Sequence, residues 1–336
     1  MKFFITGTAG FVGYHLAQRL LDDGHEVTGF DALTEYYGRG IKLARHARLA
    51  RSPRFRAVVG RLEDADLLAR SMAEAQPQIV VHLAAQAGVR HSLEQPMEYV
   101  SANLAGTLNL LAAAAAVRPQ HLLYASSSSV YGGNVEQPFA ETHRTGFPMS
   151  VYAATKSGAE ALTHAYAHLN GIATTCFRFF TVYGPWGRPD MALFRFVEAI
   201  ERGEPIEIYG GGKMARDFTY VGDLVEAIVR LTATPPILDK PIGPADSLSP
   251  VAPWRVVNIA AGRPVGLLHF ISAIEAALDR TAIRKLLPMQ PGDVVETSAD
   301  TSLLKALVGE LPATPLAEGV AAFVQWYRSD WASLQT

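Results

Sequence analysis

Short apolar runs alternate with segments of helical periodicity through the first half of the chain. Residues 11–24 and 103–117 carry apolar side chains three and four positions apart, so each segment predicts a helix with one buried face. The runs between these helices are rich in Val, Ile, Leu and Phe and predict buried strands at 2–6, 26–31, 56–60, 79–85 and 121–127. This alternation predicts an α/β fold, a Rossmann-like doubly wound parallel sheet.

The pattern changes near residue 180. The later apolar segments are shorter and mixed in type, at 190–202, 206–209, 222–232, 255–260 and 267–279. A proline-rich stretch over 234–254 predicts an irregular loop. We therefore expect a first domain over residues 1–180 and a smaller C-terminal α/β lobe over 181–330, with some segments of the lobe returning to the first domain.

Composition and charge exclude some classes of binding partner. The chain has 336 residues and a formal net charge of -2, which provides no field to attract nucleic acid or an anionic membrane. No apolar run is expected to approach the roughly 18 residues of a membrane span. The single cysteine, Cys176, rules out an internal disulfide and is interpreted as a buried inert thiol, which favours a cytoplasmic protein. His164 and His168 have metal-ligand spacing, but no third ligand accompanies them, and no metal is expected.

A glycine-rich turn follows the first predicted strand. Gly7, Gly10 and Gly13 in ITGTAGFVG lie between a strand and a helix, where the missing Cβ atoms let the backbone approach a pyrophosphate at the helix N-terminus. Asp31 ends the next strand, where a carboxylate accepts from a ribose 2′-hydroxyl and repels a 2′-phosphate. The turn and Asp31 together predict a dinucleotide site that takes NAD rather than NADP.

A second cluster of polar residues combines serines with a tyrosine and a lysine. The stretch LLYASSSSVYG places Ser127, Ser128 and Ser129 at the end of a central strand. Tyr152 and Lys156 lie at i and i+4 of a predicted helix that begins near Ser150, so both side chains share one face. We expect the ammonium to lower the pKa of the phenol so that Tyr152 acts as a general base.

Together these residues resemble the extended branch of the short-chain dehydrogenase/reductase superfamily, which contains the nucleotide-sugar epimerases and dehydratases. The resemblance runs from Phe3 to about Gly309. It is closest in the blocks LAAQAGVRHSLEQP (83–96), LLYASSSSVYGGN (122–134) and RFFTVYGPWGRPDMALF (178–194), which are similar to the UDP-glucuronate 4-epimerase group. The resemblance implies an NAD-dependent isomerase with a UDP-sugar substrate. The first domain would bind NAD, and the second lobe would mainly bind the sugar nucleotide.

The resemblance also implies roles for individual residues. Ser127 is the catalytic hydroxyl, with Ser129 as a second candidate, and Tyr152 and Lys156 are the base and its helper. The implied cofactor-binding residues are Gly7, Gly10, Phe11, Val12, Gly13, Asp31, Leu62, Leu83, Ala84, Ala85, Gln86, Asn103, Tyr152, Lys156 and Phe179. The implied substrate-binding residues are Ser127, Ser128, Ser129, Arg90, Thr181, Arg188, Phe194, Tyr209 and Arg216.

The serines also discriminate between reactions of the family. Relatives that dehydrate or decarboxylate the sugar carry an acidic side chain where this chain has Ser128 and Ser129. Hydroxyls suffice when hydride only leaves C4 and returns to its opposite face, which is the implied conversion of UDP-glucuronate to UDP-galacturonate. A 4-epimerase of UDP-glucose or another UDP-hexose, a UDP-glucuronate decarboxylase and a non-enzymatic NAD-binding sensor are the alternatives.

Three further features of the sequence concern adenine binding, a basic helix and the oligomeric state. Arg61 stands where relatives usually place an aspartate that contacts adenine, so the adenine contacts are left open. The basic residues spaced along 39–56 are interpreted as a solvated helix face, with contact to the cofactor's adenosine end as the lesser alternative. By resemblance, the helices at 103–117 and 153–169 form a two-fold homodimer interface.

Overall fold

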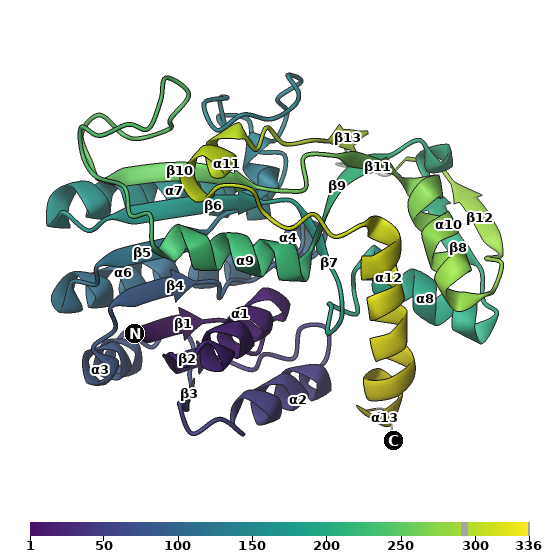
Figure 1. Ribbon diagram of the computed structural model, residues 1–336, viewed down its shortest axis with the longest axis horizontal. Coiled ribbons are helices and arrows are strands. Elements are labelled where there is room, and N and C mark those ends of the chain that lie inside the picture. The colour runs from purple at the N-terminus through teal and green to yellow at the C-terminus, as the bar shows by residue number, and fades with distance from the viewer. Residues whose placement is uncertain (290–294, 335–336) are drawn as a thin grey trace.

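A seven-stranded parallel sheet is the centre of the molecule. The computed structural model describes residues 1–289 and 295–334, and the sheet has the strand order β10-β6-β5-β4-β1-β2-β3. Its strands are β1 (Lys2–Thr6), β2 (Glu26–Asp31), β3 (Phe55–Val59), β4 (Ile79–His82), β5 (His121–Ala125), β6 (Thr174–Phe179) and β10 (Trp254–Ile259). This confirms the predicted Rossmann-like doubly wound sheet (Figure 1). The strands at 79–85 and 121–127 end earlier than predicted, at His82 and Ala125, so the polar residues that follow lie beyond the sheet edge.

Alternate side chains along each strand supply two separate cores. Phe3 and Ile5 of β1 pack in the same cluster as Leu16 and Leu20 of α1 (Phe11–Asp22) and Leu224 of α9 (Val221–Thr232). Phe4, between them in sequence, belongs to the cluster on the opposite face. That second cluster is completed by α3 (Ala65–Ala75), α6 (Gly106–Val117) and α7 (Val151–Asn170). Figure 1 shows α1 and α9 in front of the sheet and α3, α6 and α7 behind it.

The helical segment before β5 is longer than the predicted 103–117. It runs through α5 (Pro96–Tyr99), a π-helical turn (Val100–Ala105) and α6. An 18-residue window of this 22-residue run has a mean hydropathy of 1.5, so by length and composition the run could cross a membrane, contrary to the sequence expectation. Its position is that of a crossover between β4 and β5, packed on α3 and α7. Core packing in this position accounts for the buried side of the run, which is 39% of its most apolar window.

The C-terminal half contributes to both parts of the molecule. β10 and α9 belong to the large sheet and its front layer, as Figure 1 shows. Of the remaining elements, α11 (Ser302–Val308) packs on β10 and α9, and the others form the smaller lobe with two small sheets, β7-β9 with β11 and β13, and β8 with β12. Their bounds are β7 (Thr181–Tyr183), α8 (Ala192–Arg202), β8 (Ile206–Tyr209), β9 (Ala215–Tyr220), β11 (Pro264–Gly266), α10 (Leu267–Leu278), β12 (Arg284–Leu287), β13 (Glu296–Thr297), α12 (Leu316–Trp326) and α13 (Ala332–Leu334).

A buried ion pair supports the centre of the sheet. Glu160 of α7 receives two hydrogen bonds from Arg178 of β6, at 2.8 Å from Nε and 2.7 Å from Nη2. The same carboxylate accepts from the hydroxyl of Ser126, the first residue after β5. The side chains of Arg178 and Glu160 are only 4% and 7% exposed. The pair therefore fixes the end of β5 against α7, next to the predicted catalytic serines.

Removing one member of this pair should destabilise the fold strongly. Arg178→Met leaves the Glu160 carboxylate buried without its cation, and we expect a loss of about 3–5 kcal/mol in the free energy of unfolding. Arg19→Met is the matched control, because Arg19 pairs with Asp23 and Glu226 at a much more exposed position, and should cost roughly 0–1 kcal/mol. Urea denaturation measures both variants. Equal losses would contradict the assignment of Arg178 and Glu160 as a structural pair.

Candidate active site

The glycine turn after β1 is too tight for side chains. A Cβ atom on Gly13 would lie 2.0 Å from the Gly7 carbonyl oxygen, and Gly7 itself has φ +82. The Gly10 amide donates to the Gly7 carbonyl at 2.9 Å, which closes the turn at the start of α1. Thr6 braces it from below, since its hydroxyl accepts from the Ala84 amide at 3.1 Å. The turn therefore presents open backbone at a helix N-terminus, as a pyrophosphate site requires.

Asp31 ends β2 beside this turn. Its two carboxylate oxygens accept from the amides of Ala9 at 2.9 Å and Leu33 at 2.8 Å. These bonds fix the carboxylate at the wall of the cavity described below, where a ribose would lie if a pyrophosphate occupied the turn.

Two basic residues of α2 (Arg39–Leu49) complete this end of the site. The predicted solvated face is wrong for them, because Lys42 and Arg45 are buried, at 5% and 0% exposure. Lys42 donates to the Thr34 carbonyl at 2.7 Å and lines the cavity. Burial lowers the pKa of Lys42 to about 8, with Asp31 acting against the shift. Charge periodicity alone could not reveal that this helix face lies against loops from distant parts of the chain.

Arg45 joins the cofactor turn to the second lobe. Its guanidinium donates to the Ala9 carbonyl at 2.8 Å and to the Trp186 carbonyl at 2.5 Å. Trp186 lies two residues before Arg188. Arg45 therefore fixes the loop that carries Arg188 relative to the glycine turn.

The predicted catalytic residues meet at the carboxyl end of β5. Ser127 lies just beyond the strand and accepts from the Ser129 amide at 3.2 Å, at the start of a 3-10 turn over Ser128–Tyr131. Tyr152 and Lys156 lie on α7, whose first turn is capped by Ser150. Lys156 donates to the Ala125 carbonyl at 2.8 Å. Ser127, Tyr152 and Lys156 line the same cavity.

The electrostatics of Tyr152 and Lys156 differ from the expectation. Burial raises the pKa of Tyr152, while a hydrogen bond with Ser127 and the charge of Arg188 act to lower it. Burial lowers the pKa of Lys156 to about 7, while Glu160 and Cys176 act to raise it. The pKa of Tyr152 is thus raised rather than lowered, and Ser127 and Arg188 are the groups that favour its phenolate; the role of Lys156 as its helper stays a prediction.

One cavity of about 1820 Å³ contains most of the predicted site. It is large enough for a dinucleotide and a second ligand end to end. Of the residues assigned to cofactor or substrate, those that line it are Gly7, Gly10, Phe11, Val12, Gly13, Asp31, Leu62, Leu83, Ala84, Ala85, Gln86, Arg90, Ser127, Ser128, Ser129, Tyr152, Lys156, Phe179, Thr181, Arg188, Tyr209 and Arg216. The cavity thus extends from the glycine turn to the second lobe.

Two predicted residues lie outside this lining. Asn103 is buried beneath it, where its side chain accepts from the Gln86 amide at 2.8 Å and donates to Thr155 at 3.1 Å. Asn103 thus acts on the site by joining the segment after β4 to α7. Phe194 is 1% exposed and packs edge-on against Phe323 and Trp331, so its predicted substrate contact is wrong. Its position on the inner face of α8 assigns it to the core.

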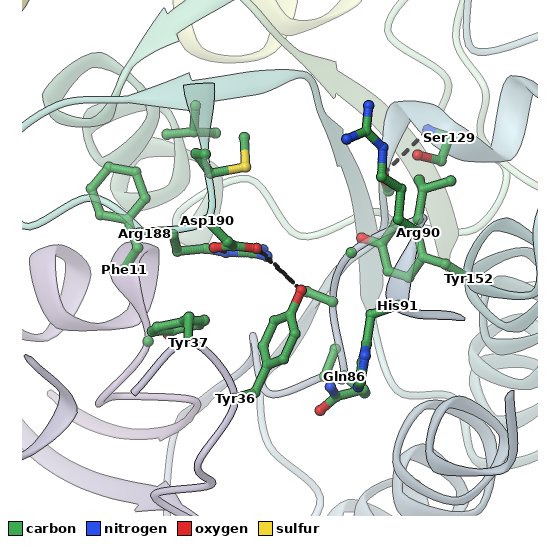
Figure 2. Close-up of a pocket in the computed structure, with 18 of the residues that line it drawn as sticks. Phe11, Tyr36, Tyr37, Gln86, Arg90, His91, Ser129, Tyr152, Arg188 and Asp190 are labelled. Atoms are coloured by element: carbon green, nitrogen blue, oxygen red, sulfur yellow. Dashed lines mark hydrogen bonds and ion pairs between the residues drawn. The ribbon is translucent and has the colours of Figure 1, made fainter. Parts of the chain in front are cut away.

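Arg188 is held by residues that sequence reasoning missed. Its Nε and Nη2 donate to Asp190 at 3.0 and 2.6 Å, and Nη2 also donates to the Tyr36 hydroxyl at 3.4 Å. Tyr36 in turn donates to Asp190 at 3.1 Å. The Tyr37 ring lies 5.5 Å from the guanidinium carbon. Figure 2 shows this group facing Ser129 and Tyr152 across the pocket.

The partners of the outer cationic residues are also defined. The Arg90 guanidinium lies over the Tyr209 ring at 5.5 Å, and the Tyr209 hydroxyl donates to Glu207. Arg216 donates to the Ala215 carbonyl at 2.8 Å. Arg61, at the other end of the cavity, donates to Glu63 at 2.9 Å. The cavity wall therefore carries arginines at both ends, which suits a ligand with several phosphate oxygens.

The parallel sheet, the glycine turn and Asp31 define a Rossmann-type dinucleotide-binding protein, and comparison with known proteins gives its family. Residues 3–241 match the NAD dependent epimerase/dehydratase family, to which the chain belongs. It is 54% identical to a probable UDP-glucuronate 4-epimerase of Rhizobium meliloti (strain 1021), over 100% of this chain and 99% of the relative. It is 43% identical to UDP-glucuronate 4-epimerase 1 of Arabidopsis thaliana, over 97% of this chain and 76% of the relative.

A solved structure agrees with these sequence matches. The UDP-glucuronic acid 4-epimerase of Bacillus cereus, in complex with UDP-glucuronic acid and NAD, superposes with a TM-score of 0.87. The two chains are 30% identical, and the match covers 98% of this chain and 99% of the other. NAD is the cofactor of the family, and the residues present fit it: the glycine cradle cannot accommodate Cβ atoms, and Asp31 stands at its side.

Asp31 should set the preference for NAD over NADP. Because its carboxylate would face a 2′-phosphate, the unaltered protein should bind NAD far more tightly than NADP. Asp31→Ala should weaken NAD binding and reduce the ratio of the two affinities, as measured by isothermal titration of both cofactors. Equal affinity of the unaltered protein for NAD and NADP would show that Asp31 does not have this role.

Proposed function

We propose that this protein is an NAD-dependent UDP-glucuronate 4-epimerase, which inverts C4 of the sugar to give UDP-galacturonate. The observation that carries the proposal is the arrangement of Tyr152 and Ser129 on one side of a single cavity and Arg188 on the other, with Ser127 hydrogen-bonded to Tyr152. A phenol suited to proton transfer and a guanidinium suited to a carboxylate thus line one substrate space. The relatives that match the chain along its full length are named for this same reaction.

The residues of the chain supply proton transfer and orientation. Tyr152 takes the proton from the O4 hydroxyl while the C4 hydrogen leaves as hydride, and it returns the proton when hydride is delivered to the opposite face. Ser127 hydrogen-bonds O4 and favours the phenolate of Tyr152. NAD, when bound, supplies a reversible acceptor for hydride. Because hydride leaves from one face and returns to the other, the 4-keto sugar must turn within the cavity between the two transfers.

The side chains at the end of β5 favour epimerisation over other fates of the 4-keto sugar. Ser128 and Ser129 line the cavity where a dehydrating or decarboxylating relative would need an acid or base. A 4-keto uronate is a β-keto acid and loses CO2 when its C5–C6 bond aligns with the carbonyl π system. Restraint of the C6 carboxylate by Arg188 and the nearby Thr181, in each of the two orientations from which hydride is transferred, suppresses that alignment.

Incubation with UDP-glucuronate and UDP-glucose in separate reactions tests the proposal. NMR of the products should show UDP-galacturonate from the first, little conversion of the second and no stoichiometric CO2. Conversion of UDP-glucose as the better substrate would favour a UDP-hexose 4-epimerase, and CO2 with a pentose product would favour a decarboxylase. NAD binding with no turnover of either sugar would favour the sensor.

We also propose that the protein is a cytoplasmic homodimer, and the apolar outer side of the α5–α6 run supports the dimer. Met97 of α5, Val100 of the π-helical turn and Leu108 of α6 are 71%, 37% and 41% exposed. A second copy of the chain would cover these side chains if two such helical layers packed around a two-fold axis. Analytical ultracentrifugation at micromolar concentration measures the oligomeric state. A monomer under these conditions would contradict the proposed homodimer.

Replacing Tyr152 should remove most of the activity. Tyr152→Phe keeps the ring and deletes the oxygen that carries the proton, so turnover of UDP-glucuronate should fall by roughly 10²-fold to 10⁴-fold. The variant should still bind NAD, as measured by titration. Retained binding distinguishes a loss of catalysis from a loss of folding. A Phe variant with a near-normal rate would remove Tyr152 from the mechanism.

Replacing Arg188 should remove selectivity for the uronate. In Arg188→Ala the C6 carboxylate loses its cation, and the KM for UDP-glucuronate should rise by roughly 10-fold to 100-fold. Weak activity on UDP-glucose should be spared, and CO2 release with reduced cofactor should increase. If the Ala variant keeps its full preference for the uronate, the carboxylate is bound elsewhere, with Arg90 the next residue to replace.

A further inference from the structure

Arg188, which is proposed to bind the carboxylate of the substrate, already forms an ion pair with the carboxylate of Asp190. Arg188 donates to both oxygens of Asp190 through one edge of its guanidinium, formed by Nε and Nη2. The two side chains are 19% and 32% exposed, so the pair lies at the cavity wall with little solvent around the arginine. A ligand carboxylate that needs this arginine must therefore compete with one already in place.

Three loops from separate parts of the chain build this arrangement. Tyr36 comes from the segment after β2, and its hydroxyl contacts both members of the pair. The Tyr36 ring stacks on the His91 ring, with ring centroids 5.0 Å apart. Arg45 holds the carbonyls of Trp186 and Gly187, directly before Arg188. The backbone and the Tyr36 ring are thus fixed, while the guanidinium, the carboxylate and the hydroxyl can exchange hydrogen bonds among themselves.

Each member of the pair favours the charged form of the other. Although burial acts in the opposite direction, Asp190 raises the pKa of Arg188. Burial likewise opposes the effect of Arg188 on Asp190, yet the pKa of Asp190 is lowered. Both groups are therefore ionised at neutral pH, and the pair carries no net charge toward the cavity. A uronate that enters the cavity meets a compensated arginine rather than an isolated cation.

We propose that Asp190 is a specificity-determining positioning residue that exchanges Arg188 with the C6 carboxylate of the substrate. This inference rests on the proposed function. When the uronate binds, Arg188 turns from Asp190 to the C6 carboxylate. When the 4-keto sugar must turn, Asp190 takes the arginine back, so that the carboxylate is released without leaving a buried cation unpaired. Asp190 thus weakens ground-state binding and lowers the barrier to ring rotation.

The Asp190→Asn variant separates this role from a purely structural one. Asparagine keeps the shape and one acceptor for Arg188 but removes the competing charge. The KM for UDP-glucuronate should fall by about tenfold, because a charged hydrogen-bond partner no longer competes for the arginine. The kcat should fall as well, and the steady-state fraction of reduced cofactor, followed by its absorbance, should rise because the turning step is slower.

Further variants complete the test. Asp190→Glu should restore KM and kcat toward wild-type values, and Tyr36→Phe should lower KM by less than Asp190→Asn does. Affinity for UDP-glucose, which has no C6 carboxylate, should be the same in Asp190→Asn and wild type. Asp23→Asn, which neutralises a carboxylate paired with Arg19 on the far side of α1, is the matched control and should change neither constant.

The outcomes are distinguishable. A higher KM in Asp190→Asn, or unchanged KM and kcat, would overturn the exchange role. A fall in kcat with no rise in reduced cofactor would also contradict it, because the lost step would not be ring rotation. If the wild-type protein does not convert UDP-glucuronate at all, the proposed function fails instead, whatever the variants show.

Discussion

The parallel direction of the strands is the constraint on which the site depends. In a parallel sheet all carboxyl ends lie at one edge, and each strand here delivers its polar residues there. β1 leads into the glycine turn, β2 ends at Asp31, β4 leads to Gln86, and β5 ends at Ala125, directly before Ser126 and Ser127. Because the chain crosses behind or in front of the sheet between strands, residues far apart in sequence line one cavity.

Buried charge is the second organising feature. Glu160 and Arg178 fix the end of β5 against α7, and Arg45 ties the glycine turn to the loop that bears Arg188. Such groups are costly to remove from water and are satisfied here by several hydrogen bonds each. They place the proton-transfer residues and the proposed carboxylate site on supports that do not themselves contact the sugar. Because these groups fix the backbone, movement during the proposed reaction is confined to a few side chains at the cavity wall.

Local signals in the sequence were sufficient for the sheet, the glycine turn and Asp31, because each depends on neighbouring residues and a strand–turn–helix context. They failed where tertiary packing decides. Lys42 and Arg45 were interpreted as solvated because their helix is basic throughout, but one face of it lies against the 186–187 loop. Phe194 was assigned to the substrate from its motif, although it packs in an aromatic core. Tyr36 has no local signal, since its bond to Asp190 joins segments 154 residues apart. Asp190 stands only two residues after Arg188, but its position in the motif does not show that it pairs with that arginine at the cavity wall.

In the proposed reaction, hydride leaves C4 and returns to the same carbon within one active site. The most direct test uses UDP-glucuronate that carries deuterium at C4, incubated with the protein and NAD in ordinary water, with NMR and mass spectrometry of the UDP-galacturonate formed. The deuterium should stay at C4 of the product, and no solvent hydrogen should enter C4 or C5. Loss of the C4 deuterium to solvent, or exchange at C5, would contradict transient oxidation at C4.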